Sequence, residues 1–236
     1  MQMRSFAVVM AGENVLASVG PKDRSVRGLG LFVRLSPMKP VDEIEALVAR
    51  VGTHPVYGYA HCMRVHALAE DLAAEEEVSY DGEILRVAAL LHDIGLYKAY
   101  AMREPADHAK RSALVARRIL QDWDFPPQAS QAVIEAIELH PPGVPGSTAS
   151  ETILLKDAIG LDYLGAIGVS RMLAMVGTED DVPDIRTAIW NAESLRQKIP
   201  DLLVLQASKD LAARRIREME DFFEDLRDAT EKLKLL

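Results

Sequence analysis

The chain has 236 residues, of which 49% are hydrophobic and 27% are charged, and its formal net charge is −9. This length suits one domain, or one domain with an appendage, and allows a substantial core. The acidic balance argues against a general nucleic-acid or membrane-surface binder, because such proteins carry a basic face. No apolar run approaches the roughly 18 residues of a membrane-spanning helix. The single cysteine, Cys62, excludes an internal disulfide and, with no convincing signal peptide, favours a cytoplasmic protein.

Residues 1–39 differ in pattern from the rest of the chain. Short apolar pieces, such as Phe6–Met10 and Leu29–Leu35, are separated by glycines. This pattern predicts one or two short strands or an irregular segment. We therefore expect residues 1–39 to form a short irregular or β-like N-terminal extension, to which we assign no chemistry.

From Pro40 onward the apolar residues follow a helical period, which predicts an all-α domain over residues 40–236. A capping box at Thr148–Glu151 predicts one helix start, and Pro141-Pro142 predicts a helix end. Helices are expected over Val41–Val51, from Pro55 or Tyr57 to Glu76, over Asp81–Ile94, Asp107–Trp123, Pro126–His140, from the capping box to about Met175, and over Asp184–Gln197 and Leu203–Leu235. The last helix carries an apolar stripe that would pack against the body or a second subunit, so a homodimer is one state that the sequence allows. The stripe consists of Leu211, Ile216, Met219, Phe222, Phe223 and Leu226.

The most informative stretch is Val87–Gly95, where five apolar residues lead directly into His92 and Asp93. The apolar run predicts a helix that is buried on most faces, and Gly95 suits a left-handed helix end. Burying an unpaired carboxylate costs several kcal/mol. A divalent cation would remove that cost, since imidazole and carboxylate are both good ligands for Mn, Fe, Zn or Mg. A His-Asp pair by itself is also common at surfaces and helix caps.

Two further residues complete a plausible ligand set. His61 lies on the preceding predicted helix, and consecutive helices joined by a short turn pack antiparallel, which brings distant positions together. Asp157 lies on an otherwise apolar helix, where a carboxylate is unusual without a partner. His61, His92, Asp93 and Asp157 would supply two nitrogen and two carboxylate ligands. The lack of neighbouring cysteines disfavours structural zinc.

The order His61, His92-Asp93, Asp157 on helices resembles the HD-domain metal-dependent phosphohydrolase superfamily, and most of all its small stand-alone bacterial members. The resemblance is carried by His61–Val65, Ala89–Ile94 and Asp157–Gly168, together with single histidines at 108 and 140, and it covers about residues 54–176. It implies an HD-domain helical bundle for residues 40–236.

The last motif departs from those relatives, which usually have Asp-Arg where this chain has Ile159 and Gly160. An ion or phosphate contact made in those relatives is therefore missing here. The departure concerns the substrate rather than the fold or the metal.

The resemblance implies hydrolysis of a nucleotide or a related small phosphorylated metabolite by a metal-activated water. The implied metal ligands are His61, His92, Asp93 and Asp157. The implied catalytic residues are Asp93, His108 and His140, and the candidate phosphate-binding residues are Arg64, Lys98 and Lys110. The cofactor would be a divalent ion, from Mn, Fe, Co, Ni, Zn or Mg, with Mn or Fe favoured.

Several alternatives remain open at this stage. Some members of the superfamily are di-iron oxygenases that use four histidines and two aspartates, some hydrate small nitriles, and others bind ligands without catalysis. His108 and His140 could bind a second metal instead of contacting substrate or carrying protons. Arg64 could form an ordinary surface salt bridge. Asp162 could orient a metal-bound histidine, and Cys62 is expected in the core.

Overall fold

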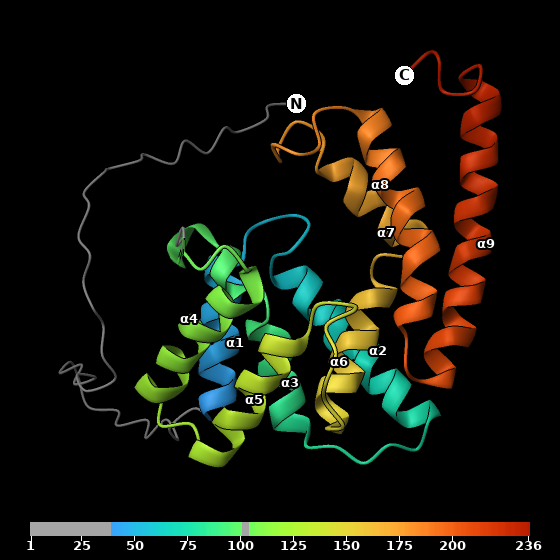
Figure 1. The fold of residues 1–236 in the computed structure, drawn as a ribbon. Coiled ribbons are helices and arrows are strands. Elements are labelled where there is room, and N and C mark those ends of the chain that lie inside the picture. The colour runs from blue at the N-terminus through green and yellow to red at the C-terminus, as the bar shows by residue number, and fades with distance from the viewer. Residues whose placement is uncertain (1–38, 101–103) are drawn as a thin grey trace, which may run out of the picture. The chain divides into compact units, whose positions relative to one another are not determined.

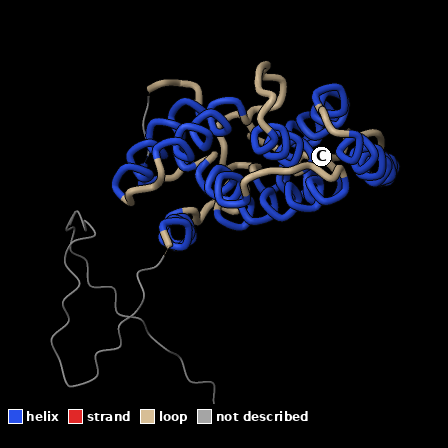
Figure 2. The backbone as a smooth tube through the Cα atoms, turned by 90° about the horizontal axis from the view of Figure 1, so that it is seen from below, coloured by secondary structure: helices blue, strands red, loops and turns tan. Residues whose placement is uncertain are grey.

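A computed structural model of the protein describes residues 39–100 and 104–236. All regular elements within these two ranges are helical (Figures 1 and 2), which confirms the predicted all-α class. The α-helices are α1 (Pro40–Val51), α2 (Tyr59–Glu75), α3 (Gly82–Leu91), α4 (His108–Asp122), α5 (Pro127–Leu139), α6 (Ser150–Leu161), α7 (Gly165–Ala174), α8 (Ile185–Lys198) and α9 (Gln206–Ala229), with short 3-10 turns η1 (Ile94–Leu96), η2 (Lys98–Tyr100) and η3 (Ile199–Leu202). The strands considered for Phe6–Met10 and Leu29–Leu35 lie outside the described residues.

Helix α3 lies at the centre of the domain, where it packs against α1, α2, α5 and α6 (Figure 1). The apolar run Val87–Leu91 is buried along its whole length, as its composition predicted. Burying one such aliphatic side chain contributes about 1.5–3 kcal/mol. This central position holds the end of α3, and with it His92, in the interior.

Helix starts follow the expected capping chemistry at three places. Asp81 accepts hydrogen bonds from Glu83 N and Ile84 N, and Asp107 accepts them from Ala109 N and Lys110 N. Asp184 caps α8 in the same way. These side chains satisfy backbone donors that have no partner inside the helix.

Two boundaries differ from the sequence prediction. The helix expected from the capping box to about Met175 is divided into α6 and α7. The chain leaves the helical path after Leu161, and Gly165, the first residue of α7, has a φ of +70° that lies outside the right-handed helical range. In addition, α6 begins after Ala149 and has no side-chain cap, so the predicted capping box is wrong. Helix α6 packs against α2 and α5.

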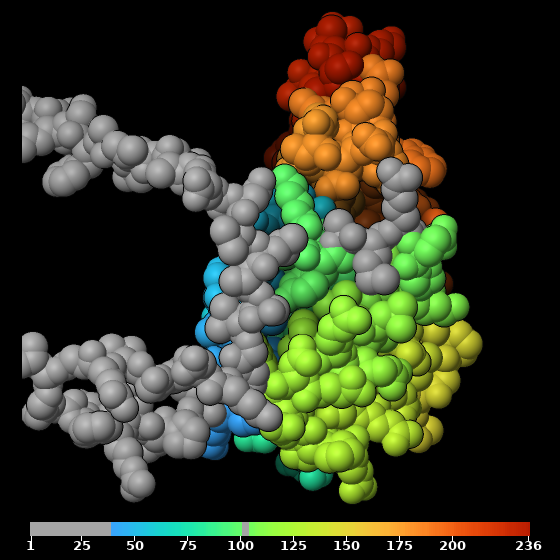
Figure 3. Space-filling view, turned by 90° about the vertical axis from the view of Figure 1, so that its left-hand side faces the viewer, coloured from blue at the N-terminus to red at the C-terminus, as the bar shows by residue number. Residues whose placement is uncertain are grey.

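The C-terminal helices form the other side of the domain, where α7 packs against α8 and α9. Met219 and Phe223 of the α9 stripe are buried, whereas Phe222 is partly exposed. In the space-filling view, the green and yellow-green atoms of α4 and α5 fill the lower part of the visible face, and orange and red atoms of the C-terminal part of the chain lie above them (Figure 3). Over the described ranges, none of the helices is long and apolar enough to cross a membrane.

Helix α3 ends at Leu91, earlier than the expected Ile94, and the chain continues into η1. Gly95 in η1 is needed for a close approach rather than for a left-handed conformation. A Cβ at this position would lie 2.6 Å from Ser112 N and 2.8 Å from Arg111 C, both backbone atoms of α4. Gly95 N also donates a hydrogen bond to Ser112 Oγ at 3.1 Å. This contact fastens the turn that follows Asp93 to α4.

We therefore predict that Gly95→Ala lowers the free energy of unfolding by about 1–3 kcal/mol, because backbone atoms must move to admit the methyl group. Urea denaturation measures the change. Gly82→Ala is the matched control, since its Cβ would approach nothing closer than Tyr80 at 4.0 Å. The control should change stability by less than about 1 kcal/mol, in the stabilising direction. Equal stability of Gly95→Ala and wild type would contradict the close-packing explanation.

Candidate metal centre

Four helix ends meet around the Asp93 carboxylate. His61 lies in the first turn of α2, His92 directly follows α3, His108 begins α4, and His140 directly follows α5. His61, His92, Asp93 and His140 are buried, while the His108 side chain is 39% exposed. The structure therefore brings together five of the residues that the sequence singled out.

His92 and His140 are each oriented by a hydrogen bond from Nδ1 to the backbone carbonyl oxygen three residues earlier. His92 Nδ1 lies 2.8 Å from Ala89 O, and His140 Nδ1 lies 2.7 Å from Ile137 O, three residues back in each helix. A carbonyl only accepts, so Nδ1 must carry the proton and donate it to a helix-terminal carbonyl. When the ring is neutral, its Nε2 therefore carries no proton, and its lone pair is free to bind a metal beyond the end of the helix.

His61 is oriented by a side chain instead of a carbonyl. Its Nδ1 donates to Asp162 Oδ2 at 2.7 Å, so its Nε2 is also bare when the ring is neutral. His61 Nε2 lies 3.1 Å from His92 Nε2 and 3.6 Å from Asp93 Oδ2, and His92 Nε2 lies 3.3 Å from the same oxygen. Ligand atoms about 2.0–2.1 Å from a shared metal are separated by about 2.8–3.4 Å in octahedral or tetrahedral geometry. The two separations that involve His92 fall within this range, and the separation of His61 Nε2 from Asp93 Oδ2 slightly exceeds it. A small shift of these side chains would let the three donor atoms share a divalent cation.

A second group uses the other oxygen of the same carboxylate. Asp93 Oδ1 lies 4.0 Å from His108 Nε2 and 4.0 Å from His140 Nε2, and these two nitrogens are 3.2 Å apart. The two groups of candidate metal ligands thus share Asp93. The second group is wider and more exposed than the first.

Burial keeps two of the histidines neutral. It lowers the pKa of His61 to about 4, against the raising effect of the Asp162 hydrogen bond, and it lowers the pKa of His140 to about 3. His92 differs, because the Asp93 carboxylate outweighs burial and raises its pKa. Burial raises the pKa of Asp93, but His92 outweighs it and holds that pKa well below its usual range. Because a metal-bound imidazole must have an unprotonated ligating nitrogen, metal binding would displace any proton on His92 Nε2.

Asp162 was considered from the sequence as an orienting residue, and the structure places it against His61. Two arginines also hold this carboxylate: Arg64 donates from Nε to Oδ1 and from a terminal nitrogen to Oδ2, each at 3.1 Å, and Arg171 lies 3.0 Å from Oδ2. Burial raises the pKa of Asp162, but the hydrogen bonds of His61 and Arg64 and the charge of Arg171 lower it to about 2. The sequence reasoning missed Arg171. The signal that could have identified it is its position as the single charged residue in the stretch Gly165–Ala174.

Asp157, the fourth ligand expected from the sequence, points to a different part of the fold. Its carboxylate accepts hydrogen bonds from Val204 N and Leu205 N at 2.8–3.1 Å. These two residues immediately precede α9, whose N-cap residue Leu205 offers no side-chain cap. The structure therefore does not bring Asp157 together with the His61, His92 and Asp93 group.

The two residues that depart from the relatives' motif are buried in the helical core. Ile159 is almost fully enclosed, and a Cβ on Gly160 would lie 3.2 Å from Leu203 and 3.4 Å from Ile199. A side chain as large as arginine would not fit at position 160 without displacing η3 and the segment after it.

The remaining candidates lie outside the two ligand groups. Lys98 and Lys110 are both exposed, Lys98 on η2 and Lys110 in the first turn of α4. Cys62 is fully buried and lies 3.3 Å from the Tyr97 hydroxyl, as expected for a core residue.

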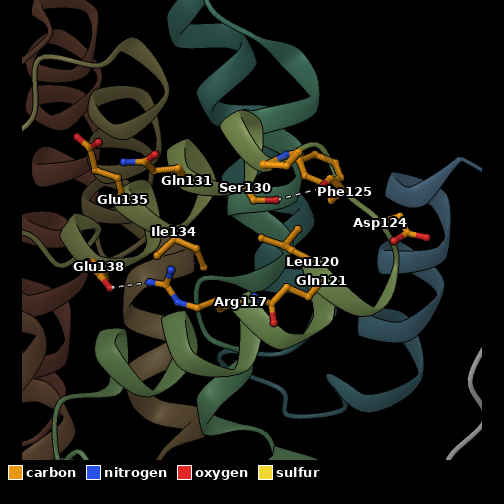
Figure 4. A pocket seen from close by; sticks show the side chains of 11 residues that line it. Arg117, Leu120, Gln121, Asp124, Phe125, Ser130, Gln131, Ile134, Glu135 and Glu138 are labelled. Atoms are coloured by element: carbon orange, nitrogen blue, oxygen red, sulfur yellow. Dashed lines mark hydrogen bonds and ion pairs between the residues drawn. The ribbon is translucent and has the colours of Figure 1, made fainter.

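A groove of about 770 Å³ lies between α4 and α5, lined by residues such as Arg117, Ile134 and Glu138 (Figure 4). None of the five histidine and aspartate side chains of the metal centre lines it.

Comparisons with known proteins concern the family and the fold of the chain. A family model described as the HD domain matches residues 58–174, and no curated protein matches the sequence. The crystal structure of Bacillus subtilis YpgQ in complex with ADP has a TM-score of 0.60 at 20% identity, covering 80% of this chain and 97% of that protein. An HD-superfamily hydrolase from Bacillus thuringiensis has a TM-score of 0.57 at 25% identity, with coverages of 80% and 96%. A predicted HD superfamily hydrolase from an uncultured Thermotogales bacterium has a TM-score of 0.56 at 22% identity, with coverages of 85% and 99%.

We predict that Asp93→Ala abolishes metal binding, because both ligand groups lose their shared carboxylate. Elemental analysis after loading with Mn²⁺ and desalting measures the number of Mn²⁺ ions bound per chain. Asp157→Asn should retain the metal but lose about 1–3 kcal/mol of stability, since three hydrogen bonds to a buried carboxylate are weakened. Full metal content in Asp93→Ala would refute the assignment. Metal loss in a folded Asp157→Asn would restore Asp157 as a ligand.

The buried histidines also predict a pH dependence for the metal-free protein. The folded pKa values of His61 and His140 lie below the value of about 6.5 for an exposed imidazole. Below about pH 6.5 the unfolded chain binds more protons, so stability is lost as the pH falls toward 4. Removing one such group in His140→Gln should make the loss between pH 7 and pH 5 smaller by about 2 kcal/mol. Denaturant titrations of the EDTA-treated proteins at the two pH values measure the free energy of unfolding. An equal loss in wild type and His140→Gln would show that His140 is not held neutral.

Proposed function

Since the chain belongs to the HD-domain superfamily, we propose that it is a metal-dependent phosphohydrolase that acts on a nucleotide or a related small phosphorylated metabolite. The observation that carries the proposal is the convergence of four histidine Nε2 atoms, two on each oxygen of the Asp93 carboxylate. The chain has the fold of HD-superfamily hydrolases, and the YpgQ complex with ADP supports a nucleotide as the ligand class. A cytoplasmic location, expected from the cysteine content, is part of this proposal.

His61, His92 and Asp93 would hold the cation through the closer of the two groups. A bound divalent cation lowers the pKa of a coordinated water and polarises a phosphoryl oxygen. We favour Mn²⁺ or Fe²⁺, because one carboxylate and two imidazoles leave several coordination positions open. Asp157 is not needed for this set.

His108 and His140 take different roles in the proposal. His140 is buried and stays neutral, which suits a ligand or a hydrogen-bond partner. His108 is the more exposed of the two and lies at the start of α4, so it can contact the substrate and carry a proton between water and the leaving group. Lys98 and Lys110 remain candidates for offsetting phosphate charge from the surrounding surface.

One observation favours a second candidate, an HD-type di-iron oxygenase. Asp93 presents one oxygen to each pair of histidines, as a carboxylate that bridges two metal ions would. The 4.0 Å spacings of the second group exceed those of the first, which is why we place the one-metal hydrolase ahead.

The experiment is a screen of the metal-loaded protein against a panel of nucleotides and other phosphometabolites, with released phosphate as the readout. We predict turnover that requires Mn²⁺ and that His108→Ala lowers kcat by about 10²–10⁴-fold, the range for loss of a proton-transfer group. The metal content of His108→Ala should stay at one ion per chain. Two irons per wild-type chain with oxygen uptake, reduced to one iron in His108→Ala, would replace the hydrolase with the oxygenase.

A further inference from the structure

The Asp162 carboxylate is immobilised more firmly than a single histidine partner requires. Its Oδ2 accepts hydrogen bonds from His61 Nδ1 and from a terminal nitrogen of Arg64 and lies 3.0 Å from Arg171, while its Oδ1 accepts from Arg64 Nε. Arg171 also donates to the Asp162 main-chain oxygen at 3.1 Å. Both carboxylate oxygens are therefore engaged, and rotation of the group would break several charge-assisted hydrogen bonds at once.

The two arginines reach Asp162 from different helices. Arg64 comes from α2, one turn after His61, and its other terminal nitrogen donates to Ala60 O at 3.3 Å. Arg171 comes from α7, is buried, and stacks on the Tyr163 ring at 4.5 Å. Asp162, whose carboxylate both arginines contact, directly follows the last residue of α6. Three helices thus converge on the carboxylate that orients one metal ligand.

The charges favour an orienting function over a substrate-binding one. A carboxylate that alone faces a histidine pulls the Nδ1 proton toward itself and adds negative charge to the ligand. Two guanidinium groups, which remain charged at all relevant pH values, share that negative charge. Arg64 has a side chain that is only 35% exposed, and its Nε and one terminal nitrogen are already used by Asp162. The Arg64 guanidinium therefore cannot form a bidentate contact with a phosphate through the two nitrogens that already bind Asp162.

We propose that Arg64 and Arg171 are positioning residues that act through Asp162 to hold His61 in the tautomer and orientation required for metal binding. This differs from the substrate-binding role that the sequence suggested for Arg64. It rests on the metal site of the proposed function but not on the reaction or the substrate.

The test is the Mn²⁺ dissociation constant, measured without substrate from the electron paramagnetic resonance signal of free Mn²⁺. Loss of an outer partner of a metal ligand typically weakens binding by about 10–100-fold. We expect Asp162→Asn to fall in that range and Arg64→Ala to weaken binding by about tenfold. Arg64→Lys should recover only part of the loss, because an ammonium cannot form the bidentate pair.

The double variant Arg64→Ala/Asp162→Asn gives the decisive comparison. If Arg64 acts through Asp162, the double variant binds Mn²⁺ no more weakly than Asp162→Asn alone, within about twofold. Arg196→Ala is the matched control, since Arg196 pairs with Glu193 and Glu220 on α8 and α9, and it should leave the constant unchanged. Arg171→Lys should weaken Mn²⁺ binding in the same direction as Arg64→Ala, and thermal unfolding of every variant verifies that it is folded.

An unchanged Mn²⁺ constant in Arg64→Ala, or additive losses in the double variant, would overturn the proposal. An unchanged constant together with a raised KM would return Arg64 to the substrate. Because the readout is metal affinity alone, a protein that binds Mn²⁺ as predicted but hydrolyses nothing would refute the phosphohydrolase and leave this inference standing.

Discussion

The structure depends on one electrostatic constraint: bare imidazole nitrogens and a carboxylate are enclosed together in a helical core. His61 Nε2 and His92 Nε2 lie 3.1 Å apart with their Nδ1 protons already donated elsewhere. Two lone pairs at that distance repel unless a cation lies between them. A divalent cation bound by His61, His92 and Asp93 would supply this positive charge.

The helices of the fold produce this arrangement through their ends. Imidazoles after α3 and α5 cap the helix carbonyls with Nδ1, which directs Nε2 into the space beyond each terminus. His61 and His108 lie in the first turns of α2 and α4, so these two histidines come from the N-terminal ends of helices, whereas His92 and His140 follow C-terminal ends. Gly95 allows α4 to approach the turn after Asp93 so closely that a methyl group would collide with its backbone. Local capping chemistry and close packing therefore place side chains that are far apart in the sequence.

Much of this was predictable because local rules decided it. The apolar run Val87–Leu91 predicted a buried helix, and Asp81, Asp107 and Asp184 predicted helix starts. His61, His92 and Asp93 were recognisable as candidate metal ligands by their residue types and their order in the chain. Where tertiary contacts decided the outcome, the sequence was less informative. The local pattern did not reveal the break before Gly165 or the absence of a side-chain cap at the start of α6.

Asp157 and Arg64 show the same limit within the candidate site. Helical period identified Asp157 as a buried carboxylate that needed a partner, but it did not distinguish a metal ion from the backbone amides at Val204 and Leu205. Arg64 was identified as lying beside His61, but its partner Asp162 lies 98 residues further along the chain. A partner at such a separation follows from the topology of the bundle, not from local pattern.

Anomalous X-ray diffraction at the manganese absorption edge, on crystals of the Mn²⁺-loaded protein, tests the central claim most directly. We predict an anomalous peak bound by His61 Nε2, His92 Nε2 and Asp93 Oδ2 at about 2.1–2.3 Å. His61 Nδ1 should still contact Asp162. A peak beside the Asp157 carboxylate, or the absence of any peak next to Asp93, would contradict the account.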